Sequence, residues 1–205
     1  MDEEAHQLLL PLVEEENICL PLPINVVSKY WNVELPMAEA IESAKKYSDF
    51  DGSIIIEGIE IAERHGLSCK IVHSSLPELK KIIDSGIPPI VILPGIPEIT
   101  QHASVITGYD EDEKTILHYI QKGNQEGEQQ EGAIPQDIFD REWSEEGRLL
   151  IIISPPDILS KITLDNNFQN ESNRLCFYSE QLNILKNFTE ALLSLKKSIE
   201  LDSNN

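Results

Sequence analysis

The chain has 205 residues, of which 40% are hydrophobic and 25% are charged, and its formal net charge is −20 at pH 7. This length and hydrophobic content predict a folded chain with one sizeable core and room for an appendage. The acidic balance argues against nucleic acid and against an anionic membrane surface as partners, because both are themselves negatively charged.

The cysteines and the N-terminal residues bear on the cell compartment. Cys19, Cys69 and Cys176 are widely and unequally spaced, which fits neither a disulfide framework nor a zinc motif and suggests a reducing compartment. The histidines show no ligand spacing, so neither a metal nor another cofactor is expected. Residues 1–10 do not resemble a signal peptide, and no apolar stretch approaches transmembrane length. We therefore expect a cytoplasmic protein.

The first third of the chain is predicted to be helical. Pro21 and Pro23 are tolerated only in the first turn of a helix, and Ile24, Val27 and Trp31 then recur at helical spacing. Two further helices are expected over residues 37–47 and 54–66. Residues 2–7 are expected to form a short helix or a frayed terminus, and residues 8–13 an extended segment.

After residue 66 the pattern changes from helices to strands. Alternation over residues 67–73 predicts a strand, residues 76–85 a helix, and the apolar run 90–93 a buried strand. Residues 103–109 and 115–120 predict a hairpin, followed by a Gln/Glu/Gly-rich loop over 121–132, a helix over 134–143 and a strand over 149–153. Helices first, then strands joined largely by turns, predict an α+β fold.

The C-terminal part is predicted to be a linker over residues 157–172 and a helical hairpin over 173–205. The hairpin turns at Asn187, and its two apolar faces are formed by Leu175, Tyr178, Leu182 and Leu185, and by Ala191, Leu192, Leu195, Ile199 and Leu201. This is the length of one tetratricopeptide repeat, which cannot bury both of its faces alone. Either the pair docks on the main domain or it begins a longer array. A helical repeat of this kind suggests protein–protein contacts.

Cys19 lies just before the predicted start of the first helix. The positive end of the helix dipole favours a thiolate, which is the nucleophile of cysteine chemistry, and a positioned histidine would complete it. The alternative is that Cys19 is a small buried hydrophobe, as free cysteines often are.

Four separated segments resemble the papain-like double-glycine leader peptidases, which include the peptidase domains of bacteriocin-exporting ABC transporters. Cys19-Leu20-Pro21 through Tyr30-Trp31 takes the place of the cysteine motif of this family, and residues 102–110 (HASVITGYD) match its histidine motif. Residues 85–92 and 138–155 are similar to its Gly-x-Pro-x-Ile-Val strand and to its closing helix and strand. The resemblance implies a papain-like α+β domain over residues 1–156.

The resemblance also implies roles for individual residues. Cys19 takes the place of the nucleophile and His102 that of the general base, acting on a peptide or protein without a cofactor. His118 stands where the family has the acidic residue that orients the imidazole; Asp110 and Asp112, in the predicted turn, are poorer geometric candidates. A neutral histidine can accept a hydrogen bond from His102, but it supplies no negative charge.

Two further positions depart from the family pattern. Glu14 stands where the family has its oxyanion glutamine, with Glu15 one residue out of register. A carboxylate there accepts hydrogen bonds and repels developing negative charge, although a protonated Glu14 could donate if burial raised its pKa. Leu20 replaces the glycine beside the nucleophile, so its side chain is expected to crowd the substrate groove.

Three functional hypotheses follow. The chain is a cysteine peptidase of weak activity or altered specificity, or a degenerate peptidase-like module that binds peptides or proteins, or chiefly a repeat scaffold whose front domain is a cap. The peptidase hypothesis requires the Cys19 sulfur and the His102 imidazole to face each other across a cleft.

Overall fold

The computed structural model describes residues 6–11, 21–47, 54–94, 101–120, 130–162 and 167–203. The chain forms two compact units, and it passes through each of them twice. The first unit contains residues 1–15 and 73–152, and the second contains residues 16–72 and 153–205. Segments far apart in the sequence therefore build each unit together.

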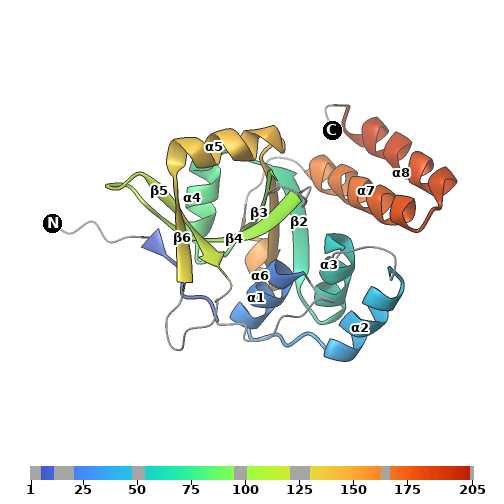
Figure 1. Ribbon diagram of the computed structural model, residues 1–205, viewed down its shortest axis with the longest axis horizontal. Helices are drawn as coiled ribbons and strands as arrows, with labels where there is room; N and C mark the ends of the chain where they lie inside the picture. Colours follow the sequence, from blue (N-terminus) through green and yellow to red (C-terminus); the bar gives the residue numbers. More distant parts are fainter. Residues whose placement is uncertain are drawn as a thin grey trace. The chain divides into compact units, whose positions relative to one another are not determined.

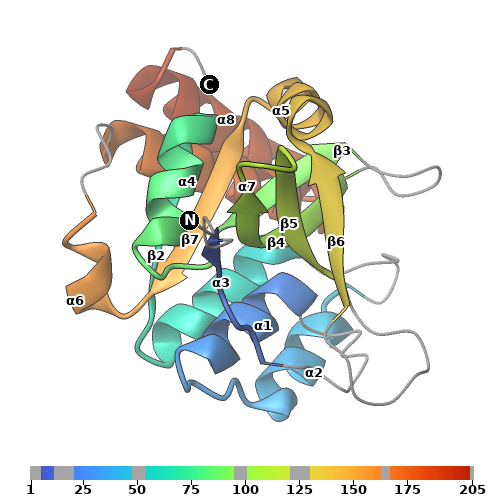
Figure 2. The same ribbon diagram turned by 90° about the vertical axis from the view of Figure 1, so that its left-hand side faces the viewer.

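The first unit is built on an antiparallel sheet in which the strands follow the order β7-β3-β4-β5-β6 (Figure 2). The short strand β1 pairs with β4. Helix α4 packs on β4 and β1, and helix α5 packs on β3, β5 and β6. The buried side chains of the two helices are Leu79, Ile82 and Ile83 of α4 and Phe139 and Trp143 of α5. These elements are β1 (His6–Gln7), α4 (Leu76–Asp84), β3 (Ile90–Pro94), β4 (Gln101–Asp110), β5 (Thr115–Ile120), β6 (Gln130–Pro135), α5 (Gln136–Glu145) and β7 (Leu149–Ser154).

The second unit is mainly helical and is centred on helix α3. Helices α1, α2 and α7 all pack on α3, and α7 and α8 form an antiparallel hairpin (Figure 1). The apolar face of α3, which includes Ile56, Ile59 and Ile61, is fully buried. The elements are α1 (Leu22–Tyr30), α2 (Met37–Lys45), α3 (Ile55–Arg64), β2 (Ser68–His73), α6 (Pro156–Leu159), α7 (Asn167–Ile184) and α8 (Phe188–Leu201).

The α+β class predicted from the sequence is confirmed, and most elements begin and end within about three residues of their predicted bounds. The main error in the first unit concerns β6, which lies partly in the stretch predicted to be a loop. Its residues pair with β5 from Thr115↔Pro135 to Ile120↔Gln130. The sequence QEGAIP lacks the apolar alternation of a typical strand and has a single β-branched residue, Ile134, so backbone pairing with β5 decides its conformation.

The N-terminus also differs from its prediction as a short helix or a frayed end. His6 and Gln7 form β1, opposite Tyr109 and Gly108. The imidazole of His6 stacks on the Tyr109 ring at a centroid distance of 4.7 Å, and its Nδ1 lies 2.7 Å from the Asp84 carboxylate. Gly108 makes the pairing possible, because a Cβ there would lie 2.3 Å from the backbone oxygen of His6.

The C-terminal helical hairpin is confirmed, but its first helix begins earlier than predicted, and most of the apolar face of its second helix is exposed. Helix α7 begins at Asn167 and α6 spans 156–159, so part of the predicted linker is helical. On α8 the residues that are buried are Ala191 and Ser198, whereas Leu192, Leu195 and Ile199 are exposed. Small residues face α7 because hydroxyl groups join the two helices: Ser172 Oγ lies 2.8 Å from Ser198 Oγ, and Ser179 Oγ donates to the Ala191 oxygen at 3.0 Å.

Candidate active site

The structure describes only some of the residues that the sequence assigns to the site. Glu14, Cys19 and Leu20 lie outside the described residues. His102 is the second residue of β4, with Leu93 of β3 as its register partner. Their roles, and the approach of the Cys19 sulfur to the His102 imidazole, therefore stay predictions.

Helix α1 begins three residues after Cys19, at Leu22, with Pro21 as its N-cap and Pro23 in the first turn. The Pro21 oxygen accepts hydrogen bonds from the amides of Ile24 and Asn25 at 3.0 and 3.2 Å. Gly58 of α3 lets this end of α1 approach closely, since a Cβ at Gly58 would lie 3.0 Å from Pro21 Cδ. The start of α1 at Pro21, two residues after the candidate nucleophile, is thus held against α3.

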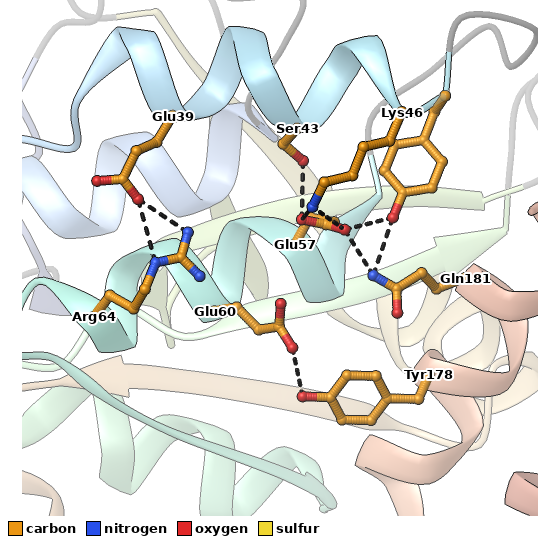
Figure 3. A network of polar contacts seen from close by, with 9 residues as sticks. Glu39, Ser43, Lys46, Glu57, Glu60, Arg64, Tyr178 and Gln181 are labelled. Atoms are coloured by element: carbon orange, nitrogen blue, oxygen red, sulfur yellow. Dashed lines mark hydrogen bonds and ion pairs between the residues drawn. The ribbon is translucent and has the colours of Figure 1, made fainter.

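One residue before Gly58, the carboxylate of Glu57 is buried in a polar network that joins α2, α3 and α7 (Figure 3). It accepts hydrogen bonds from the Tyr47 hydroxyl, from Ser43 Oγ at 3.0 Å and from Gln181 Nε2 at 2.7 Å. Burial alone would raise the pKa of the Glu57 carboxyl. The hydrogen bonds from Tyr47 and Ser43 and the charge of Lys46 outweigh burial, so the pKa is lowered.

Helix α7 also binds the backbone of β2 through its polar side chains. Asn170 Oδ1 accepts from the Ile71 amide at 2.8 Å, and Asn173 Nδ2 donates to the Ile71 oxygen at 3.0 Å. Arg174 donates to the Cys69 oxygen at 3.1 Å and pairs with Glu63 of α3. These contacts occupy backbone groups of β2 that could otherwise pair with an added strand.

In the first unit, His118 of β5 has Ile106 of β4 as its register partner. Its Nδ1 lies 3.1 Å from Ser104 Oγ, and Ser104 is almost fully buried. Ser104 follows His102 by two positions in the same strand, so positions 102 and 104 lie on one face of the sheet. His118 therefore meets β4 on the face that carries position 102.

Asp110 lies too far along β4 to be the group that orients His102 in the predicted site. Asp110 is eight residues further along β4, which at the rise of a strand is about 26 Å and beyond the combined reach of two side chains. Its carboxylate instead stabilises the turn, accepting from the amides of Asp112 and Glu113 at 2.9 Å each. The register partner of His118, by contrast, is only four residues from His102.

Sequence reasoning missed Ser104 and Glu57. Ser104 could have been found from strand alternation, because it lies two residues after the candidate base. Glu57 lies among the isoleucines of α3, but the same helix carries Glu60 and Glu63, so the sequence alone does not mark Glu57 as the buried carboxylate. Its partner Gln181 could not have been found, because 124 residues separate the two.

No protein-family model matches the sequence, and no curated protein is similar enough in sequence to count as a relative. Solved structures do match. A double-glycine-motif protease from an AMS/PCAT transporter, solved in complex with the leader peptide, is 18% identical with a TM-score of 0.50, covering 73% of this chain and 94% of the other. The peptidase domain of Streptococcus ComA, a bifunctional ABC transporter, is 17% identical with a TM-score of 0.50, covering 71% and 97%.

The chain has the papain-like fold of the double-glycine peptidase domains. At this level of sequence identity the structural similarity establishes the fold alone. The chemistry has to be argued from the residues of this chain. Among the described residues, no helix is long and apolar enough to cross a membrane, and no group of three His, Cys, Asp or Glu side chains could hold a metal ion.

Proposed function

We propose that this chain is a papain-like cysteine peptidase module acting on a peptide or protein, with Cys19 as the nucleophile and His102 as the general base. The double-glycine peptidase fold carries the proposal, together with the presence of a cysteine before α1 and a histidine in β4. A peptide partner is supported by the neighbour solved with a leader peptide.

The proposed reaction is acyl transfer through the thiol. The His102 imidazole takes the Cys19 proton, and the thiolate attacks the carbonyl carbon of the scissile peptide bond. The C–N bond then breaks, the leaving amine takes the proton from the imidazolium, and water hydrolyses the thioester with His102 again acting as base. The Cys19 amide and a protonated Glu14 would hold the oxyanion.

Two substitutions make this a slow peptidase of altered specificity. Losing one oxyanion donor costs about 10² to 10³ in rate, and Glu14 donates only in its protonated form. Leu20 beside the nucleophile would narrow the groove, so a Gly-Gly substrate is not the expected one.

Alkylation by iodoacetamide at neutral pH tests the proposal. Burial raises the pKa of Cys69 to about 12, so its thiol gives almost no background. Cys176 is half-buried and is removed by Cys176→Ser, which keeps a polar partner for Ser198 Oγ. In this background Cys19 should react at least tenfold faster than a free thiol, and His102→Ala should abolish the excess. Equal, slow labelling with and without His102 would overturn the proposal.

The second candidate function is a binding module that has lost turnover. His118 in place of an acid and Glu14 in place of a glutamine favour it. The double variant Glu14→Gln with His118→Asp restores the two family residues. Cleavage of a leader-type peptide by this variant alone would support the binding module, because it would show that the parent retains the fold and has lost only the chemistry.

The α7–α8 pair is proposed to serve protein–protein contacts, as an adjunct to the peptidase-like part or as a scaffold. Its exposed apolar side chains, Leu185, Phe188, Leu192, Leu193, Leu195 and Ile199, support this role. The proposal keeps the predicted division of the chain into a peptidase-like domain over residues 1–156, a linker over 157–172 and a helix pair over 173–205.

A further inference from the structure

We propose that the α7–α8 hairpin binds a second copy of this chain through one face of α8, with the two α8 helices antiparallel. The pairing rests on the protein-contact role proposed above for the hairpin, for which it names the partner. It does not depend on the chemistry of Cys19, and every residue that carries it lies in the described range 167–203.

The surface is a narrow apolar stripe along α8. Its four side chains are between 40% and 63% exposed, and they are Phe188, Leu192, Leu195 and Ile199. Their spacing of four, three and four residues places them on one face of the helix. This is the spacing at which one helix packs against another along a coiled-coil seam.

The hairpin is held together by a different face of α8. Ala191 and Ser198 are buried on the side of α7. Ser198 Oγ lies 2.8 Å from Ser172 Oγ and 3.2 Å from Cys176 Sγ, both on α7. The stripe is therefore left for contact with another surface, and a contiguous exposed apolar patch on a folded protein commonly marks such a contact.

The stripe is complementary to itself. An interface between two copies related by a two-fold axis brings the same surface of each copy together. In an antiparallel pair of α8 helices the spacing of four, three and four residues is the same in both directions. Phe188 would then pack against Ile199 of the second copy, and Leu192 against Leu195 of the second copy. All four apolar side chains of each stripe would be covered at once.

The charges around the stripe permit this pairing. Helix α8 carries two glutamates and two lysines, and residues 167–203 carry five acidic and four basic side chains, in a chain of net charge −20. Beside the stripe, Lys196 would face Thr189 of the second copy, so like charges would not meet. A nearly neutral stripe is the surface through which two acidic chains can associate with least repulsion, whereas a partner selected by opposite charge would need a border of one sign.

The expected dimer is weak. The stripe covers about three turns of one helix, which is less than the roughly 800 Å² per partner of a standard stable interface. We therefore expect association at protein concentrations between about 10 µM and 1 mM. Added NaCl should strengthen it, because screening reduces the repulsion between two acidic chains and leaves the apolar contact in place.

Sedimentation velocity of the full chain over this concentration range tests the proposal. Leu192→Gln and Leu193→Gln are matched variants, because the two leucines are 54% and 53% exposed and only Leu192 belongs to the stripe. The wild type should form dimers, Leu192→Gln should weaken association at least tenfold, and Leu193→Gln should weaken it less than twofold. A monomeric wild type, equal effects of the two variants, or dimers that dissociate on addition of NaCl would overturn the second copy as partner.

Thr189→Glu tests the antiparallel arrangement. The new carboxylate would face Lys196 of the second copy, so association should tighten at least threefold although each chain becomes more acidic. Unchanged or weaker association would overturn this arrangement of the two helices.

Thermal unfolding of Leu192→Gln separates the pairing from the contact role on which it rests. It is measured at about 1 µM, where the wild type is expected to be monomeric and dimerisation cannot shift the melting temperature. An unchanged melting temperature together with a monomeric wild type would overturn the second copy alone. A melting temperature lowered by more than about 5 °C would show that the stripe belongs to the core of the hairpin, and would overturn the contact role as well.

Discussion

Replacing the buried carboxylate of Glu57 by an amide, as in Glu57→Gln, should destabilise the second unit by removing the charge at the centre of its polar network. The side chain is 8% exposed and accepts hydrogen bonds from Ser43, Tyr47 and Gln181. Glutamine keeps the shape. With its oxygen on Tyr47 and Gln181, its NH₂ group would face the Ser43 hydroxyl, which can accept, and the Lys46 ammonium, which cannot.

The expected loss can be worked from these bonds. A hydrogen bond to a charged group contributes about 1.5–3 kcal/mol and a neutral one about 0.5–1.5 kcal/mol, so each surviving bond weakens by about 1 kcal/mol. The ion pair with Lys46, at 3.4 Å, is lost outright because the amide carries no charge. The neutral side chain costs less to bury, which offsets part of the loss. A net loss of about 2 kcal/mol follows, or about 5 °C in melting temperature for a chain of this size.

The pH dependence gives a sharper signature than the melting temperature. The pKa of Glu57 is lower in the folded protein than its ordinary value of 4.5, so its contribution is fully present above pH 4.5 and is lost as the pH falls through the folded pKa. The difference in unfolding free energy between wild type and Glu57→Gln should therefore be constant near neutral pH and shrink below about pH 4.5.

Denaturant unfolding at several pH values measures both effects. Glu60→Gln is the matched control on the same helix, because the Glu60 carboxylate accepts from Tyr178 at 2.6 Å but is less buried. Glu60→Gln should lower the free energy of unfolding by no more than about 1 kcal/mol. Equal losses for the two variants, or a Glu57→Gln difference that does not shrink in acid, would refute the reasoning.

Three other predictions concern close approaches and thiol reactivity. Gly108→Ala should displace β1, because its Cβ would overlap the strand; amide exchange at Leu8, whose N–H donates to the β4 backbone at 2.6 Å, should then accelerate at least tenfold. Gly58→Ala should lower the free energy of unfolding, measured with denaturant, by about 1 kcal/mol, because crowding of Pro21 outweighs the gain in helix propensity. A higher free energy of unfolding would show that α1 can move away from α3 without cost. Cys69 should stay unlabelled by iodoacetamide at pH 7.5 until the protein is unfolded by denaturant, because burial raises its pKa to about 12.

The local pattern of apolar residues was sufficient to predict a helix or strand where one face of that element is buried. Ile24 and Val27 mark α1 at helical spacing, and Ile90 to Ile92 mark β3 as a continuous apolar run, and all are buried. Pattern failed at β6 and at the start of α7. The first is a polar strand formed by pairing with β5, and the second is an Asn-rich turn of helix whose Asn170 bonds to the backbone of β2.

The site divides in the same way. The order of the cysteine and histidine motifs along the chain carried the resemblance to the double-glycine peptidases, and the fold they imply is confirmed. The substitution of His118 for an acid was equally visible in the sequence. The hydrogen bond between His118 and Ser104 was not visible in the sequence, because the register between two strands determines which side chains lie close together.

The amino-acid sequence by itself therefore determined the helices and strands with an apolar face, the α+β class and the motif order, since each depends on residues a few positions apart. The tertiary structure alone decided that Gln181 reaches Glu57, that Gly108 admits β1, and that the apolar stripe of α8 faces outward. These contacts join residues brought together by the folded backbone, and short-range periodicity contains no information about which distant partner a polar or small side chain will meet.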